Sequence, residues 1–552
     1  MPASPATAGG RGPITTNSPP LPEVTESAFQ FDQALFLQID TIARTENPIN
    51  AQSARDLAVE NGADPLTIRL IDSRLAWYRG DLTLANELLA DVSEEFPNAL
   101  FIIAEAEYRA AIATHWISAA TLAHRRSLLD TQQSSQHRAR LFNYLIKATG
   151  KQRRKAAEQA PYGSEWLGWI ALAEAYSTDQ NAVALWQRQH PRHPGSIELP
   201  QALQERASHV APQQLALLLP MSGPLQSAGE AVLDGFIREL MAHFPQPEQR
   251  PWVNIIDTAE TPALEALARA QQQGAELIVG PLAKKDVETV GDQAQLPLPV
   301  IALNRPEGLD RAASSDWQTL SLAPEDEAEQ IARLAFGRGL RRAVVLTPQG
   351  DWGARMQAAL VTSWRSLGGQ IAAIDQIPSG TEANRRVSAL VGSARSDARI
   401  KQVEDAFNAP VEARPRRRQD LDVIFLLAPD AETAKSLRPL LVFHFAGDLP
   451  VFAPSTIIDR DIDGGLRDLN GVYFVQSPSS ERDAKTDSLS RLAALGADAA
   501  TMLDHWRYAS NDTVVLFRGK TGLLTRQASG TITRELTLHA IDGDRIREIT
   551  LD

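Results

Sequence analysis

The sequence predicts an α + α/β protein, in which a helical N-terminal region precedes two lobes built on parallel sheets. Apolar residues recur at helical spacing throughout residues 28–206. From residue 215 onward, short apolar runs alternate with amphipathic stretches, the pattern of a parallel sheet covered by helices on both faces. The alternation starts again after Asp326, and we therefore expect two Rossmann-like lobes with a cleft between them.

Composition excludes several classes of function. Of the 552 residues, 43% are apolar and 22% are charged, as in globular proteins. The net charge of -13 argues against sequence-independent nucleic-acid binding, which needs an excess of Lys and Arg to displace counterions. Cysteine is absent, so a disulfide, a thiolate nucleophile and a Cys-based zinc site are all excluded.

The chain begins with a segment that predicts disorder. Residues 1–27 are rich in Pro, Ala, Gly, Ser and Thr, and lack the basic and apolar segments of a signal peptide. We expect a disordered leader there.

Residues 28–206 are predicted to form a helical solenoid like that of tetratricopeptide repeats (TPR-like). Leu75–Asp81 reads Leu-Ala-Trp-Tyr-Arg-Gly-Asp and is followed by Ala85 and Pro97. In such a unit Tyr and Gly close the first helix, a small Ala admits the second, and Pro ends it. The pattern returns weakly at 172–176. Because the spacing is irregular, a plain helical bundle is the alternative.

A Pro-rich joint separates this region from the α/β part. Prolines between His190 and Pro200 end the helices, and residues 207–212 are the expected linker to a second domain at 213–552. The expected strands are 215–219, 253–256, 277–279 and 300–303 in the first lobe, and 343–346, 371–374 and 423–427 in the second. The expected helices are 228–244, 262–273, 284–293, 327–336, 352–367 and 386–391.

The last segment switches to a different strand pattern. Residues 531–538 alternate in strand fashion, and Asp542-Gly543-Asp544 predicts a tight hairpin turn. We expect a small antiparallel unit from Val514 onward.

Two short motifs resemble type I periplasmic binding proteins. Residues 217–224, Leu-Leu-Leu-Pro-Met-Ser-Gly-Pro, followed by Asp234-Gly235-Phe236, resemble the opening of that fold. Residues 519–524, Gly-Lys-Thr-Gly-Leu-Leu, resemble its C-terminal hairpin. The resemblance implies a two-lobed fold of the same kind for residues 213–552.

A second set of motifs is similar to a narrower family. These segments are 280–282, 302–304, 416–422, 439–451 and 467–471. Together they resemble the LpoA family of outer-membrane lipoproteins, over about residues 28–552. The resemblance implies a non-enzymatic activator of a bifunctional class A penicillin-binding protein. It also implies a place in the periplasm, at the inner leaflet of the outer membrane. The family's lipid anchor is an N-terminal Cys, which this sequence does not contain.

Three residues are candidates for a ligand site in the cleft. Ser222 and Gly223 follow the first expected strand, and Asn304 follows the fourth. Ligands of open α/β sheets bind at the carboxyl ends of the strands, where helix N-terminal amides favour anions. A ligand there would favour the alternative function, a solute-binding protein for an amino acid or small anion. The structural alternative is that Ser222 only caps a helix.

A strip of Arg is the candidate partner surface. Arg416, Arg417 and Arg418 follow Arg414 and Pro415, and guanidinium groups suit an acidic partner segment. We favour the structural interpretation, in which these Arg pair within the domain, because Asp420 and Asp422 are adjacent.

Catalytic motifs are missing from the sequence. It contains no GxSxG, P-loop or HExxH motif, and its ten His are scattered without ligand spacing. His190 and His193 are three residues apart, but they lie in a Pro-rich turn. We expect no enzymatic activity, no cofactor and no metal.

Overall fold

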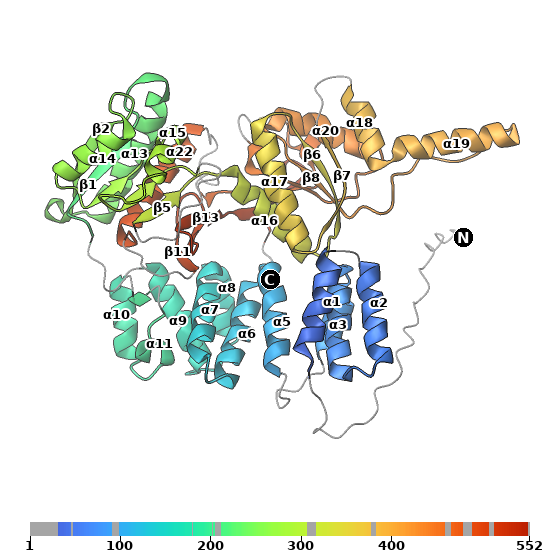
Figure 1. The fold of residues 1–552 in the computed structure, drawn as a ribbon, viewed down its shortest axis with the longest axis horizontal. Coiled ribbons are helices and arrows are strands. Elements are labelled where there is room, and N and C mark those ends of the chain that lie inside the picture. Colours follow the sequence, from blue (N-terminus) through green and yellow to red (C-terminus); the bar gives the residue numbers. More distant parts are fainter. Residues whose placement is uncertain are drawn as a thin grey trace, which may run out of the picture.

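A layer of helices lies along two α/β lobes in the computed structural model (Figure 1). The structure describes residues 31–45, 48–90, 99–178, 180–200, 203–204, 211–305, 316–376, 382–458, 465–478, 488–506 and 513–549. The expected leader and most of the expected linker lie outside these residues. No helix in the described ranges is long and apolar enough to cross a membrane.

The N-terminal region is an array of helices packed as neighbours along the chain. They are α1 (Gln33–Thr45), α2 (Pro48–Glu60), α3 (Pro65–Tyr78), α4 (Leu82–Ala90), α5 (Ala99–Ile112), α6 (Trp116–Leu129), α7 (Ser134–Lys147), α8 (Gly150–Glu158), α9 (Glu165–Thr178), α10 (Gln180–Gln189) and α11 (Pro194–Ile197). The motif at 75–81 ends α3, where Gly80 takes a positive φ of 82°. Ala85 is fully buried in α4, and its carbonyl accepts from the Ser73 hydroxyl of α3. A small residue therefore admits the second helix, as the motif predicts.

The first lobe is built on an eight-stranded sheet. Its strands are β1 (Gln214–Leu219), β2 (Trp252–Asp257), β3 (Leu277–Val279), β4 (Val300–Ala302), β5 (Trp317–Leu320), β11 (Val514–Arg518), β12 (Leu523–Arg526) and β13 (Thr531–Glu535). Their order is β11-β12-β13-β5-β4-β3-β1-β2, with parallel pairing from β13 through β2. The main helices are α13 (Gln226–His243), α14 (Ala263–Gln272), α15 (Lys284–Gly291) and α22 (Ser488–Thr501).

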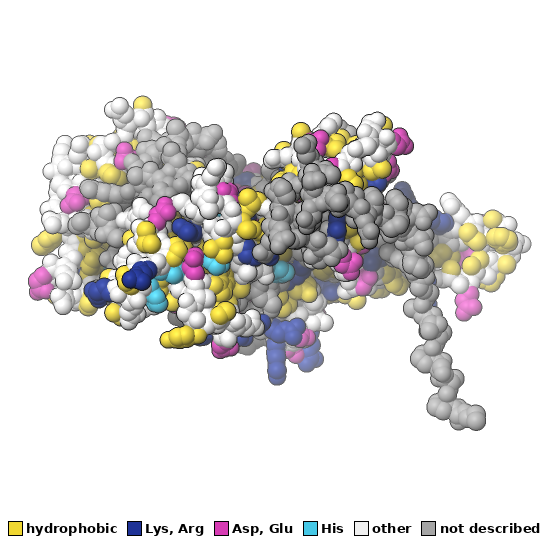
Figure 2. All heavy atoms as spheres, turned by 90° about the horizontal axis from the view of Figure 1, so that it is seen from below, with side chains coloured by type: hydrophobic (Ala, Val, Ile, Leu, Met, Phe, Trp, Pro, Cys, Tyr) yellow, Lys and Arg dark blue, Asp and Glu magenta, His cyan; other side chains and the backbone are white. Residues whose placement is uncertain are grey.

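The second lobe is built on a seven-stranded sheet. Its strands are β6 (Arg342–Thr347), β7 (Gln370–Gln376), β8 (Val423–Leu426), β9 (Val451–Ala453), β10 (Val472–Gln476), β14 (Thr537–Asp542) and β15 (Arg545–Glu548), in the order β15-β14-β10-β9-β8-β6-β7. The helices are α16 (Pro324–Gly337), α17 (Asp351–Ser366), α18 (Glu382–Val391), α19 (Ser393–Phe407) and α20 (Ala431–Phe443). Two views show α19 projecting from this lobe away from the body (Figures 1 and 2). The two-lobed fold predicted from the alternation is thus confirmed.

The expectation of a separate antiparallel unit at the C-terminus is wrong. The chain divides at Leu536, so that β13 pairs with β5 of the first lobe while β14 pairs with β10 of the second. Each sheet thereby covers an edge whose backbone groups would otherwise be unpaired. The predicted turn is confirmed, since Gly543 joins β14 to β15 with a φ of 61°.

The helical array packs against both lobes rather than hanging from a linker. One core cluster joins Phe142 and Trp169 of the array to Leu495 of the first lobe. A second core cluster joins Trp77 of α3 to Phe336 and other side chains of the second lobe. The underside of the array, by contrast, shows apolar and charged side chains intermingled (Figure 2). The domain boundary at 207–212 stays a prediction.

Candidate functional site

Ser222 lies at the carboxyl end of β1, as predicted, but its hydroxyl is engaged. It hydrogen-bonds to the carboxylate of Asp257, and this bond is the main reason why the pKa of Asp257 lies below its usual range. The same carboxylate accepts the backbone N–H of Met221 at 2.8 Å and of Ala259 at 2.9 Å. The alternative of a capping role is wrong, because the Ser222 side chain makes no capping bond to the short helix at Gly223–Leu225.

Asn304 lies on the same edge of the first sheet, after β4. Its amide donates to the Leu282 carbonyl at 3.0 Å, and its side-chain oxygen accepts the N–H of Arg305 at 2.9 Å. Asn304 thus ties the end of β4 to the loop after β3. The topology brings Ser222, Gly223 and Asn304 to one edge of the first sheet.

One small cavity between the lobes is lined by ionic groups of the described residues. A cavity of about 40 Å³ lies where the chain crosses between them, beside Glu327, Ser455 and Arg534. The Glu327 carboxylate accepts the N–H of Ser455 at 2.7 Å and its hydroxyl at 3.0 Å. Pockets for small molecules usually span about 300–1,000 Å³. This cavity is therefore too small for an amino acid.

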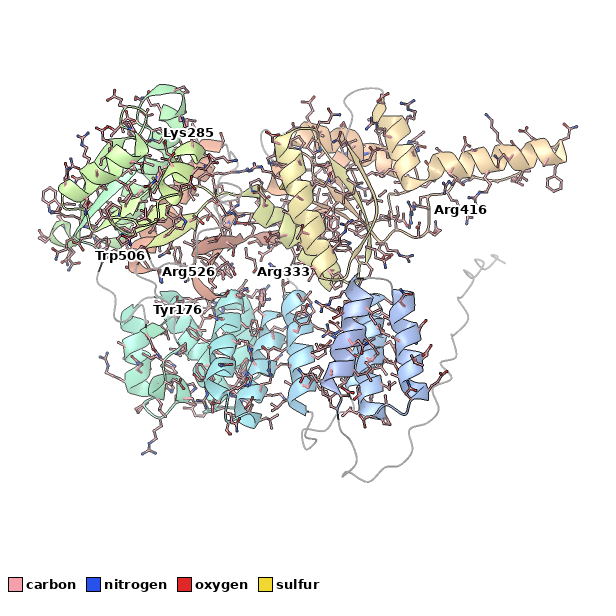
Figure 3. All side chains as sticks on the ribbon, in the orientation of Figure 1. Tyr176, Lys285, Arg333, Arg416, Trp506 and Arg526 are labelled. Atoms are coloured by element: carbon pink, nitrogen blue, oxygen red, sulfur yellow. The ribbon has the colours of Figure 1, made fainter. Side chains whose placement is uncertain are left out.

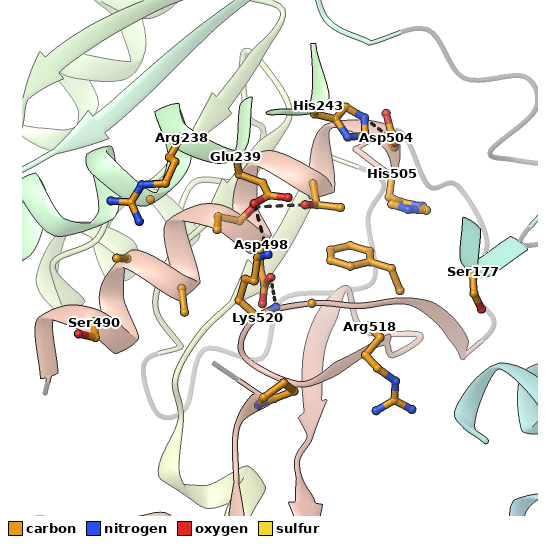
Figure 4. Close-up of a pocket in the computed structure, with 18 of the residues that line it drawn as sticks. Ser177, Arg238, Glu239, His243, Ser490, Asp498, Asp504, His505, Arg518 and Lys520 are labelled. Atoms are coloured by element: carbon orange, nitrogen blue, oxygen red, sulfur yellow. Dashed lines mark hydrogen bonds and ion pairs between the residues drawn. The ribbon is translucent and has the colours of Figure 1, made fainter. Parts of the chain in front are cut away.

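A larger groove lies at the seam between the helical array and the first lobe (Figure 4). Its volume is about 1020 Å³, and its walls come from α9, α13, α22 and the β11–β12 turn. Tyr176 of α9 reaches up to this seam (Figure 3) and donates to the Leu516 carbonyl at 2.5 Å. Sequence analysis missed the groove because α9, α13 and α22, which form its walls, lie far apart along the chain.

The charges in this groove are paired with one another. His243 lies 3.0 Å from Asp504, and the ammonium of Lys520 lies 3.7 Å from Glu239. Asp498 is buried, and its carboxylate accepts the N–H groups of Lys520 and Thr521 at 2.6 and 2.8 Å. Asp498 therefore holds the β11–β12 turn against α22.

We predict that Asp498→Ala lowers the free energy of unfolding by about 2–3 kcal/mol, since it leaves buried donors without an acceptor. Burial raises the pKa of Asp498 to about 6 from 3.8, so the folded state binds its proton more tightly than the unfolded state. Protonation of Asp498 therefore raises the free energy of unfolding of the wild type as the pH falls from about 6 to 4. The difference between wild type and variant should therefore grow between pH 7 and pH 4.5 in urea titrations. A difference that shrinks would contradict the assignment.

The Arg strip lies at the base of α19, where Arg416 is exposed (Figure 3). Arg417 forms two hydrogen bonds to Asp448, at 2.9 and 2.6 Å, and Arg418 forms two to Asp420, at 2.7 and 2.5 Å. These bonds hold the pKa values of both carboxyl groups below their usual range. Asp422 contacts the backbone N–H of Arg342 instead. The guanidinium of Arg416 has no acidic partner among the described residues.

Metal-binding geometry is not found in the described part of the chain. No cluster of three or more His, Asp or Glu side chains there could hold an ion. Both ring nitrogens of His193 are engaged, with the Glu165 carbonyl at 2.9 Å and the Gly195 N–H at 3.1 Å.

Comparison with known proteins points to one family. Residues 98–541 match the family described as LppC putative lipoprotein. The penicillin-binding protein activators LpoA of Photobacterium profundum and Aliivibrio fischeri are 29% and 28% identical over 406 and 394 residues. These alignments cover 69% and 67% of this chain, and 65% of the length of each relative.

Solved structures share the fold of the whole chain. Two crystal structures of full-length LpoA from Haemophilus influenzae superpose with TM-scores of 0.53 and 0.50 at 20% identity. They cover 94% and 93% of this chain, and 94% of each of those chains. At this identity the likeness shows the architecture alone.

Proposed function

This chain belongs to the LpoA family of LppC-type putative lipoproteins, and we propose that it activates a bifunctional class A penicillin-binding protein without catalysing a reaction itself. The observation that carries the proposal is the match of residues 98–541 to the family, together with relatives named as penicillin-binding protein activators. The proposed site of action is the periplasm, at the inner leaflet of the outer membrane, through the family's lipid anchor, whose Cys this sequence does not contain.

In this proposal, activation is a shift of the synthase from its inactive to its active conformation. A regulator stimulates a synthase when it binds the active conformation more tightly than the inactive one. A surface that is already held in its binding geometry loses less entropy when it binds. Core clusters that join the helical array to each lobe support this, because they connect the lobes through a third body.

The solute-binding alternative is not favoured. Solute-binding proteins of two lobes close around a ligand by hinge motion. Here the helical array packs against both lobes, which opposes such a motion. Relatives carry the name of activators.

A reconstituted assay tests the proposed function. The purified chain is mixed in detergent with a class A synthase of the same organism, and glycan polymerisation and peptide crosslinking are followed. We expect a severalfold higher rate of at least one reaction. A class B synthase, which lacks the polymerising activity, serves as the control and should not respond. Unchanged rates of both reactions would reject the proposal.

Arg416→Glu is predicted to reduce this stimulation at least tenfold without changing the melting temperature. Its side chain is exposed and makes no ion pair among the described residues, so reversal affects a partner rather than the fold. The matched control is Arg385→Glu, which changes another Arg of this lobe whose side chain is 78% exposed. Surface ion pairs contribute about 0–1 kcal/mol, so the control should keep both stability and stimulation. A lower melting temperature for Arg416→Glu would point to a structural role instead.

A further inference from the structure

Three apolar side chains stand exposed at the end of α20 on the second lobe. Val442, Phe443 and Phe445, named here the aromatic patch, are 54%, 68% and 47% exposed. Large aromatic side chains in such a position leave substantial apolar surface in water, which is typical of binding sites. Trp, Tyr and Phe anchors often dominate protein interfaces.

The backbone at Phe445 takes a conformation that Phe rarely adopts. Its N–H donates to the Val442 carbonyl at 3.1 Å, and the N–H of Ala446 donates to the Leu441 carbonyl at 2.8 Å. These two bonds close the helix in a Schellman motif, whose next-to-last residue is left-handed and usually Gly. Phe445 occupies that position with a φ of 62°. The sequence thus keeps an aromatic side chain where Gly would fit with less strain.

The hydrogen bonds of a largely buried His hold the patch in position. Between the two Phe residues, the ring of His444 is 9% exposed. Its Nδ1 lies 3.0 Å from the Ser393 hydroxyl, at the start of α19, and its Nε2 lies 2.5 Å from the Asn384 side-chain oxygen of α18. The end of α20 is therefore tied to two neighbouring helices. Such preorganisation lowers the entropy lost when a partner binds.

A cationic segment is joined to the loop that follows the patch. The Arg417–Asp448 ion pair joins the Arg strip to the loop that follows α20. Of the four Arg in 414–418, Arg417 and Arg418 pair with Asp, whereas Arg414 and Arg416 are exposed and have no carboxylate partner among the described residues. The whole chain carries a net charge of -13, so this cationic segment is a local exception.

We infer that the aromatic patch is the anchor through which the second lobe binds the synthase. The occupant is an apolar protein segment flanked by acidic side chains, which meet Arg414 and Arg416. Apolar anchors at the centre and complementary charges at the rim are the common arrangement of a specific interface. The inference rests on the proposed function and adds the binding surface and the chemistry of the partner segment.

Two substitutions separate binding from stability. Phe443→Ser removes an exposed ring and should weaken binding of the full chain to the immobilised synthase at least tenfold, with little change in melting temperature. Phe445→Gly removes the other ring and also relieves the left-handed strain. It should weaken binding at least tenfold while raising the melting temperature. If Phe445 served only the structure, its replacement would not weaken binding while raising the melting temperature.

The control and the salt dependence complete the test. Trp252→Ser removes a ring that is 78% exposed on the first lobe and should leave binding unchanged. Association of the unmodified chain should slow as salt rises from 50 to 300 mM, in about the range where exposed charges are screened. Equal binding by the unmodified chain and both patch variants would overturn the inference alone. The inference would also be overturned if the unmodified chain formed a dimer and Phe443→Ser converted it to a monomer, because the patch would then bind a second copy of this chain. If the unmodified chain neither binds nor stimulates, the proposed function fails and the inference fails with it.

Discussion

Replacing Trp77 by Ala should lower the free energy of unfolding by about 3–5 kcal/mol, the usual cost of removing a buried Trp. The side chain is 3% exposed and lies between the helical array and the second lobe. Its ring meets the ring of Phe336 edge-on at 5.1 Å, and the guanidinium of Arg341 lies 5.5 Å from it. Arg341 also donates to the Trp77 carbonyl at 2.9 Å. The substitution therefore opens a cavity at the joint itself.

Hydrogen exchange followed by mass spectrometry would locate this effect. Faster exchange is expected in α3, α16 and β6, together with an earlier urea transition. Trp252→Ala is the matched control, because that Trp is 78% exposed and lies far from the joint, on β2. A loss below about 1 kcal/mol for Trp77→Ala would show that the array does not brace the second lobe.

Gly235→Val should cost about 3 kcal/mol or more, since it forces apart the two central helices of the first lobe. A Cβ added at Gly235 of α13 would overlap the Ala493 carbonyl of α22. A Cβ added at Gly496 of α22 would overlap the Val232 carbonyl of α13. The two backbones touch at these glycines, so the larger residue cannot be accommodated by rotating a side chain.

The neighbouring position provides the control for this change. Asp234→Val introduces the same β-branched residue into the same helix, where the native side chain is 62% exposed. Its ion pair with Arg238 is a surface pair and contributes about 0–1 kcal/mol. Thermal melts of both variants test this prediction, and Gly235→Val should have the lower melting temperature. Similar melting temperatures would mean that α13 and α22 can separate without loss.

Sequence alone predicted many of the regular elements of the two lobes. The expected strand at 215–219 corresponds to β1, and the expected helix at 352–367 corresponds to α17, within one residue at each end. Such predictions succeed because periodicity reflects burial, which the parallel sheets and their covering helices require on defined faces. Several elements have no counterpart among those expected: α20, α22, β5, β9 and β10, and also the projecting helix α19. Only Ser393 is buried along it, so its sequence lacks an apolar stripe.

The candidate site was harder to predict than the fold. Position on the sheet edge was foreseeable for Ser222 and Asn304, because parallel strands place their carboxyl ends together. Their hydrogen-bond partners could not be predicted. Asp257 lies 35 residues beyond Ser222 in the sequence and comes close to it only because β1 pairs with β2. For the Arg strip, adjacency identified Asp420 as a partner of Arg418, but not Asp448 as the partner of Arg417.

The sequence by itself determined many local properties of this protein: the strands and helices that periodicity marks, the turn at Gly543, the absence of cysteine chemistry and the motifs of its family. Only the tertiary structure decided that the C-terminal strands divide between two sheets, and that the helical array closes a core with each lobe. The physical reason is that local properties depend on neighbours along the chain. Burial against a distant surface and pairing at a sheet edge depend on which segments the fold brings together. The aromatic patch shows both, because the apolar residues of 442–445 can be read in the sequence, whereas their exposure and the left-handed backbone of Phe445 appear only in the folded chain.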